Sequence, residues 1–141
     1  MKIYFAGSIR GGRQDLDIYK ELIDHLRSYG EVLTEHVGED NISENGEINL
    51  TDKYIHDRDV NWIDECDVFI AEVTNPSLGV GYEVRVAIEK KKRILCIYRP
   101  KELKRVSAMI IGAPEVKILP YSTIDDAKKT IDDFVKDAKN E

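Results

Sequence analysis

The sequence predicts an α/β fold in which a mostly parallel, five-stranded sheet is covered by helices on both faces, as a three-layer sandwich. Short apolar runs, mostly rich in β-branched or aromatic residues, recur along the 141-residue chain, and longer amphipathic stretches separate them. Strands that alternate with helices in this way form parallel sheets with helices on either side. The length fits one domain, residues 1–141, that is large enough to bury a core.

The N-terminal third of the chain predicts two strands and a helix. Residues 2–7 are the first strand, and residues 31–36 are a weaker candidate for another. Between them the stretch 15–30 predicts a helix that Gly30 ends. The apolar face of this helix holds Leu16, Tyr19, Leu22, Ile23 and Leu26. The polar, acidic segment 37–50 is either a solvated loop or a lid over a site.

The rest of the chain continues the alternation. Residues 51–66 predict a helix capped by Thr51, and its inward side chains are expected to be Tyr54, Ile55, Trp62 and Ile63. The remaining strands are expected at 67–73, 93–99 and 116–121. The remaining helices are expected at 81–92, with an apolar stripe of Val84, Ala87 and Ile88, and at 123–140.

Composition limits the classes of function. The net charge of −6 disfavours nucleic-acid binding, which needs a basic face, although a few converging arginines can still hold a small phosphorylated ligand. No apolar run approaches the roughly 20 residues that span a bilayer, and residues 1–8 lack the apolar core of a signal peptide. A cytoplasmic protein is therefore expected. Cys66 and Cys96 are expected to be buried free thiols rather than a disulfide.

The turn after the first strand, within YFAGSIRGGR, is typical of an anion site. It stands between a strand and a helix, where backbone N–H groups attract phosphate. Ser8, Arg10 and Arg13 could supply a hydroxyl and two guanidinium groups to a monophosphate. The turn matches neither G-x-G-x-x-G nor the P-loop, which disfavours a dinucleotide or a triphosphate. The alternative is a flexible turn that tolerates arginine.

A second glycine-rich loop, TNPSLGVGYE at 74–83, follows another strand. Its glycines are costly near a helix start, which indicates close approach of a backbone or a ligand. Ser77 either caps the helix or touches phosphate. Glu83 is expected in or near the opening turn, where the helix dipole favours the ionised carboxylate of a nucleophile. Dipole complementarity alone is the alternative.

A third candidate group lies in YIHDRDVNWIDE. His56 and Asp59 are three residues apart and share a helical face, so Asp59 could be a general acid if a neighbouring carboxylate raises its pKa. A metal held by this pair with Glu35 or His36 is the alternative, but no complete ligand motif is present, so neither metal nor cofactor is expected. Two carboxylates beside a phosphate cradle fit cleavage of a glycosidic bond.

Six separated motifs resemble, in order and spacing, the 2'-deoxynucleoside 5'-phosphate N-hydrolases, which are relatives of the nucleoside 2-deoxyribosyltransferases. The motifs are YFAGSIRGGR, TEH, IHDRDVNWI, AEVTNPSLGVGYE, KRILCIYRP and SAMIIG, and they span about residues 2–113. The resemblance weakens over residues 38–50 and in the C-terminal helix. It implies a Rossmann-like domain, a homodimer, and hydrolysis of deoxynucleoside monophosphates to a free base and 2-deoxyribose 5-phosphate.

The resemblance also implies roles for individual residues. Glu83 matches the nucleophile, Asp59 the general acid/base, and Tyr4 the tyrosine that positions the nucleophile. The positions that match substrate-binding residues are Gly7, Ser8, Ile9, Arg10, Gly11, Gly12, Arg13, His36, Ser77 and Gly79. Ser107, Ala108 and Met109 match a segment that the partner subunit of the homodimer contributes to the site.

Three other functions are compatible with the same motifs. A deoxyribosyltransferase would pass the sugar to a second base, but an unphosphorylated nucleoside would leave Arg10 without a ligand. A non-catalytic nucleotide sensor would leave Tyr4, Asp59 and Glu83 without a role. A hydrolase of ribonucleotides differs only in the shape of its pocket, which the sequence does not reveal.

Overall fold

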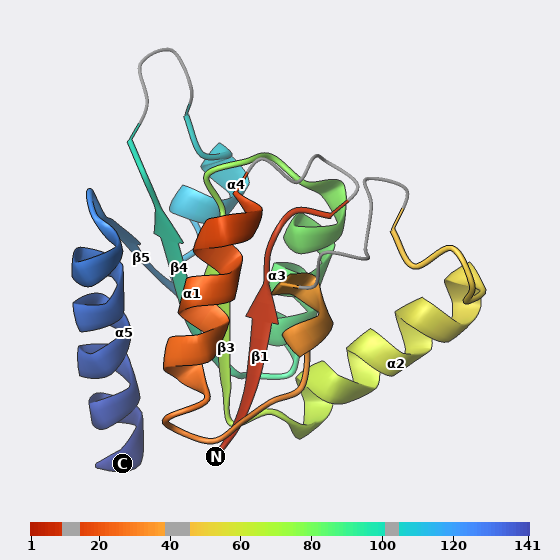
Figure 1. Cartoon of the computed structure of the whole chain (residues 1–141), viewed down its shortest axis with the longest axis horizontal. Helices are drawn as coiled ribbons and strands as arrows, with labels where there is room; N and C mark the ends of the chain where they lie inside the picture. The colour runs from red at the N-terminus through yellow and green to blue at the C-terminus, as the bar shows by residue number, and fades with distance from the viewer. Residues whose placement is uncertain (10–14, 39–45, 101–104) are drawn as a thin grey trace.

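A five-stranded parallel sheet with the order β2-β1-β3-β4-β5 forms the centre of the computed structural model, which describes residues 1–9, 15–38, 46–100 and 105–141 (Figure 1). The strands are β1 Lys2–Ala6, β2 Glu31–Val32, β3 Val68–Glu72, β4 Arg93–Tyr98 and β5 Val116–Pro120. All neighbouring strands run parallel. The predicted α/β class is confirmed, and the weaker strand candidate is real but only two residues long.

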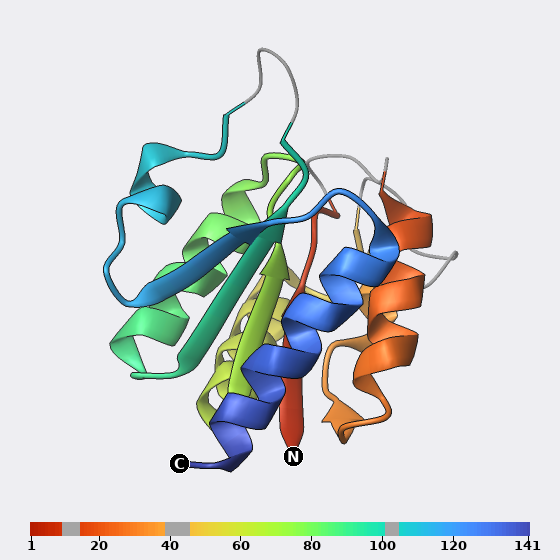
Figure 2. The same ribbon diagram turned by 90° about the vertical axis from the view of Figure 1, so that its left-hand side faces the viewer.

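Helices cover both faces of the sheet, which confirms the predicted three layers (Figures 1 and 2). They are α1 Leu16–Leu26, α2 Asp52–Glu65, α3 Leu78–Glu89, α4 Ala108–Ile111 and α5 Ile124–Lys139, with the short 3-10 helix η1 at Glu35–Gly38. The core is divided accordingly. Ile3, Phe5 and Ile70 of the sheet pack with α1 and α5, whereas the alternate residues Tyr4 and Phe69 pack with α2 and α3.

Side-chain caps stand at the starts of α2 and α3. Thr51 accepts a hydrogen bond from the backbone N–H of Tyr54 at the start of α2, as predicted. Ser77 does the same for the N–H of Val80 at the start of α3. Helix α3 therefore begins at Leu78 rather than at 81, and Glu83 lies in its second turn instead of its opening turn. Gly79 and Gly81 thus both lie inside the helix, in its first turn.

Three further details differ from the sequence prediction. Helix α1 ends at Leu26, four residues before Gly30, whose actual role is close backbone approach: a Cβ there would lie 2.0 Å from the carbonyl oxygen of Met1. Tyr54 does not face inward, because it is 56% exposed. The short helix α4 was not predicted, although Ser107 caps it by accepting a hydrogen bond from the N–H of Met109.

Both cysteines are buried and neither is in a disulfide, as predicted. Burial raises the pKa of the Cys66 thiol to about 11 and that of Cys96 to about 12, so both stay protonated and unreactive. Within the described part of the chain, none of the helices is long and apolar enough to cross a membrane.

Candidate active site

A cavity of about 1350 Å³ opens at the carboxyl ends of the strands, between α2, α3 and α4. The sheet order reverses between β1 and β3, and in open parallel sheets ligands bind in the crevice at such a switch point. The residues singled out from the sequence that line this cavity are Gly7, Ile9, Asp59, Ser77, Gly79, Glu83, Ser107, Ala108 and Met109. Segments far apart in the chain therefore meet where the sequence predicted a site.

Glu83 and Tyr4 form a polar pair beside the cavity. Tyr4 is buried in β1, and its hydroxyl is hydrogen-bonded to the carboxyl group of Glu83. Burial, followed by the negative charge of Asp59, raises the pKa of Glu83 to about 8, while the hydrogen bond from Tyr4 lowers it by less. The prediction that the helix dipole keeps Glu83 ionised is thus wrong, because Glu83 lies beyond the first turn and burial dominates.

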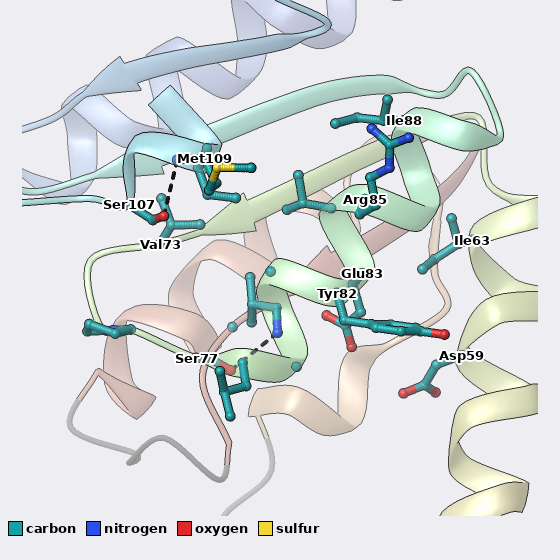
Figure 3. Close-up of a pocket in the computed structure, with 18 of the residues that line it drawn as sticks. Asp59, Ile63, Val73, Ser77, Tyr82, Glu83, Arg85, Ile88, Ser107 and Met109 are labelled. Carbon is teal, nitrogen blue, oxygen red and sulfur yellow. Dashed lines mark hydrogen bonds between the residues drawn. The ribbon is translucent and has the colours of Figure 1, made fainter. Parts of the chain in front are cut away.

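Asp59 reaches the same space from α2. Figure 3 shows its carboxyl group pointing from α2 towards α3, where Tyr82 and Glu83 lie. Burial raises the pKa of Asp59, and the adjacent Arg58, whose Nε donates to Asp59 Oδ1 at 2.9 Å, partly opposes this shift. The expected direction of the shift is confirmed, but its main cause is burial rather than a second carboxylate.

Arg58 is a residue beside the site that no sequence motif singles out. Its side chain is only 14% exposed and donates two hydrogen bonds to Glu47, at 2.9 and 2.7 Å. Its guanidinium lies 4.6 Å from the ring centroid of Trp62. No spacing in the sequence indicates this contact, because Glu47 belongs to the polar segment before α2.

Asp59 and Glu83 influence each other's ionisation. Because each is partly desolvated and the charge of Asp59 raises the pKa of Glu83, ionising both at once is disfavoured. Burial and the charge of Asp59 therefore favour the protonated form of Glu83, while the hydrogen bond from Arg58 favours the ionised form of Asp59. A nucleophile paired with a proton donor requires the opposite arrangement, in which Glu83 is ionised and Asp59 is protonated.

The glycines that precede Glu83 leave room in the cavity. A Cβ at Gly81 would have nothing within 4 Å, and one at Gly79 would meet only the hydroxyl of Ser77 at 3.8 Å. Packing among the described residues therefore does not demand glycine here, in contrast to Gly7, where a Cβ would lie 3.0 Å from the ring of Tyr19. The open space lies on the cavity side and is consistent with close approach of a ligand.

Other predicted site residues lie beside the cavity or outside the described chain. Ser8 is completely buried beyond the end of β1, and its N–H donates to the hydroxyl of Tyr19 at 3.0 Å. His36 lies in η1, 3.7 Å from a carboxylate oxygen of Glu47. Arg10, Gly11, Gly12 and Arg13 lie outside the described residues.

His56 faces the cavity but is engaged by neighbouring side chains. Its Nε2 lies 2.9 Å from the hydroxyl of Tyr82, and its Nδ1 lies 3.0 Å from Asp57. Across the described ranges, no three His, Cys, Asp or Glu side chains come together as a metal-binding group.

Apolar side chains surround the mouth of the cavity. Leu78 is 97% exposed and Tyr82 is 55% exposed on α3, and Met109 is 83% exposed on α4. Figure 3 shows Met109 and Ser107 on the side of the cavity opposite Asp59. Large apolar groups this exposed and this close together mark a surface that binds another molecule.

The raised pKa of Glu83 predicts a pH-dependent stability. When folding raises the pKa of a carboxyl from 4.5 to about 8, the folded state binds the proton more tightly than the unfolded state does. Ionisation of this carboxyl therefore lowers the free energy of unfolding. Replacing Glu83 by Gln should therefore stabilise the protein relative to the unaltered chain as the pH rises from 5 to 8, by at most about 1.4 kcal/mol per pH unit. Urea denaturation at each pH measures this.

The matched control for that experiment is Glu89→Gln. Glu89 is exposed on the same helix, where it pairs with Arg85 at 3.3 Å. The stability difference between this variant and the unaltered protein should not grow with pH. A flat difference for Glu83→Gln would contradict the raised pKa.

Fold and site together define a class: a doubly wound α/β protein with paired carboxyl groups in the switch-point crevice, an arrangement suited to cleaving glycosidic bonds. The chain belongs to the nucleoside 2-deoxyribosyltransferase family, whose model matches residues 3–132.

Relatives within this family are enzymes that act on nucleotides. The chain is 45% identical over 142 residues to the 5-hydroxymethyl-dUMP N-hydrolase of Tetraodon nigroviridis, covering 99% of this chain and 100% of that protein. It is 58% identical over 113 residues to the 5-hydroxymethyl-dUMP N-hydrolase of Danio rerio, covering 80% and 79%. The predicted family and the N-glycosidase class are thereby confirmed.

The fold is also that of a solved structure, the CMP N-glycosidase of Clostridium botulinum. That structure matches 95% of this chain and 99% of its own, with a TM-score of 0.70 and 22% identity. This likeness supports the fold prediction.

Proposed function

We propose that this protein hydrolyses the N-glycosidic bond of 2'-deoxynucleoside 5'-monophosphates, releasing a free nucleobase and 2-deoxyribose 5-phosphate. The observation that carries the proposal is the pair Asp59 and Glu83, whose carboxyl groups reach one cavity from two helices. Relatives named as N-hydrolases of a deoxynucleoside monophosphate support the substrate class.

The mechanism assigns one role to each carboxyl group. Glu83, as the carboxylate, attacks C1' and forms a covalent glycosyl ester while the bond from C1' to the base nitrogen breaks. Asp59 gives its proton to the departing base, then accepts one from the water that hydrolyses the ester. Such a retaining route needs carboxyl groups about 5–5.5 Å apart. The hydroxyl of Tyr4 orients Glu83 and stabilises its ionised form.

The reaction needs Glu83 to be ionised and Asp59 to be protonated when the substrate is bound. A substrate that fills the cavity brings the base nitrogens next to Asp59 and the electron-poor anomeric carbon next to Glu83, which favours the carboxylate there. A 2-deoxy sugar lacks the electron-withdrawing hydroxyl, so its oxocarbenium-like transition state is easier to reach. The turn with Ser8, Arg10 and Arg13 would hold the 5'-phosphate and orient the sugar by remote binding energy.

A homodimer is part of the proposal. The exposed apolar side chains of Leu78, Tyr82 and Met109 around the cavity support it, because a second subunit would cover them. In this arrangement Ser107, Ala108 and Met109 complete the partner's site.

Met109→Glu tests the dimer. Placing a charge at a side chain that is 83% exposed costs the folded subunit little, but it would bury an unpaired carboxylate in the interface. We expect a monomer in analytical ultracentrifugation and a loss of turnover of at least about tenfold, with an unchanged melting temperature at high dilution. The matched control, Ile48→Glu, replaces another exposed apolar residue outside this cluster and should stay dimeric.

Base release from the four deoxynucleoside monophosphates tests the function, with ribonucleotides and unphosphorylated deoxynucleosides as controls. Adding a free acceptor base separates hydrolysis from transfer, since a transferase would form a new nucleoside efficiently without the phosphate. Binding without base release over hours would instead support a nucleotide sensor.

We also propose a cytoplasmic location. Two buried free thiols are typical of proteins in a reducing compartment. Fractionation of cells that express the protein would test this.

A further inference from the structure

A buried ionic network lies beside the proposed active site and is not used by its chemistry. Arg99, the first residue after β4, extends its guanidinium to Asp15 Oδ1 at 2.7 Å and to the hydroxyl of Tyr121 at 2.8 Å. Glu72 Oε2 lies 3.7 Å from the same guanidinium. Arg99 therefore joins the ends of β3, β4 and β5 to the residue that precedes α1.

Removing these charged groups from water costs free energy that their mutual attraction often does not recover. A contribution to stability therefore explains the network poorly. Glu72 is completely buried and Asp15 is 8% exposed, yet one guanidinium serves both carboxylates. Among the described residues, Asp15 Oδ2 and Glu72 Oε2 have no hydrogen-bond partner. Burial raises the pKa of Glu72, while the charge of Arg99 and hydrogen bonds involving Thr74 oppose that shift.

Asp15 occupies the N-cap position of α1, but its side chain does not cap the helix. Aspartate before the first residue of a helix normally accepts a hydrogen bond from the next turn, but within the described chain the carboxylate of Asp15 makes no such cap. It turns to Arg99 instead. The backbone N–H of Arg99 is itself fixed by the hydroxyl of Thr74 at 2.9 Å, so Asp15 is tied to a rigid point of the sheet edge.

Hydrogen bonds hold Ser8 and Asp15, which lie at the two ends of the turn after β1. On one side the N–H of Ser8 donates to the hydroxyl of Tyr19 in α1 at 3.0 Å. On the other, the backbone oxygen of Asp15 accepts from the N–H of Tyr19 at 3.0 Å, and its carboxylate binds Arg99. Tyr19 and Arg99 together therefore fix where the turn leaves the sheet and where it enters α1.

We infer that Arg99 is a positioning residue for 5'-phosphate binding, acting through Asp15 to hold the helix-side end of the turn that follows β1. The inference rests on the proposed function, since it takes that turn as the phosphate site. Arg99 does not touch the reacting atoms in this assignment. Without it, the carboxylates of Asp15 and Glu72 lose the guanidinium that they share, and Asp15 is no longer tied to the sheet edge.

The test compares binding of 2'-deoxyuridine 5'-monophosphate with binding of 2'-deoxyuridine by titration calorimetry. Arg99→Met should raise the Kd of the monophosphate by about tenfold or more while the Kd of the nucleoside changes little, because only the phosphate contact is displaced. Arg99→Lys keeps the positive charge but lacks the planar guanidinium, so it should retain part of the preference for the monophosphate over the nucleoside. Asp15→Asn, which removes one buried charge, gives a second variant if Arg99→Met fails to fold, and it should weaken the same preference.

The matched control is Arg93→Met, at the opposite end of β4, where Arg93 pairs with Glu141 and lies over the ring of Phe134. This variant should bind both ligands as the unaltered protein does. Equal weakening of both ligands by Arg99→Met and Asp15→Asn, or no weakening, would overturn the inference. Turnover is not needed for this measurement, so absence of base release from the unaltered protein would count against the proposed function alone. Equal affinity of the unaltered protein for both ligands would overturn the phosphate site and this inference together.

Discussion

Glu83→Gln is expected to reduce kcat for base release by about a thousandfold or more, because the amide cannot form the glycosyl ester. Glutamine has nearly the same shape and can still accept the hydrogen bond from Tyr4, so the fold and the cavity should persist. Substrate affinity should change by no more than a few-fold. Single-turnover kinetics and titration calorimetry measure the two quantities separately.

Chemical rescue distinguishes a lost nucleophile from a disturbed pocket. Glu83→Ala leaves space beside C1', so added azide should attack in place of the carboxylate and yield an azido sugar phosphate. The exposed residue Glu89 on the same helix provides the control, since Glu89→Gln should keep full activity. An unchanged kcat in Glu83→Gln would refute the nucleophile assignment.

Local signals in the sequence predicted most of the fold. The strand runs, the caps at Thr51 and Ser77 and the alternation of elements depend on neighbours in the chain, so they could be identified without tertiary information. The start of α3 was placed too late because Gly79 and Gly81 lower helix propensity, yet the structure keeps both inside the helix. Tertiary packing overrides propensity here.

The partners of the site residues could not be predicted in the same way. Arg58 binds Glu47 and stacks on Trp62, and Arg99 reaches back to Asp15 across 84 positions of the sequence. No periodicity encodes such contacts. The pKa of Glu83 depends on burial and on Asp59 from another helix, so sequence reasoning, which had only the helix dipole, gave the wrong direction.

Asp59→Asn is expected to reduce kcat by about 10²–10⁴-fold for ordinary nucleobases, because the departing base loses its proton donor. The loss should be much smaller for a deoxynucleotide of 7-methylguanine, whose cationic base leaves without being protonated. A disturbed pocket would slow both substrates equally, so this comparison isolates the acid role.

The same variant should shift the pH dependence of the reaction. The negative charge of Asp59 is one of the two causes that raise the pKa of Glu83 to about 8, and the other, burial, stays in place. Removing that charge makes Glu83 ionise at lower pH and also leaves the pair without a proton donor, so the falling limb of kcat/KM, which reports loss of the donated proton from the free enzyme, should disappear. A falling limb that persists in Asp59→Asn would mean that the donated proton comes from another group, and Asp59 could not then be the general acid.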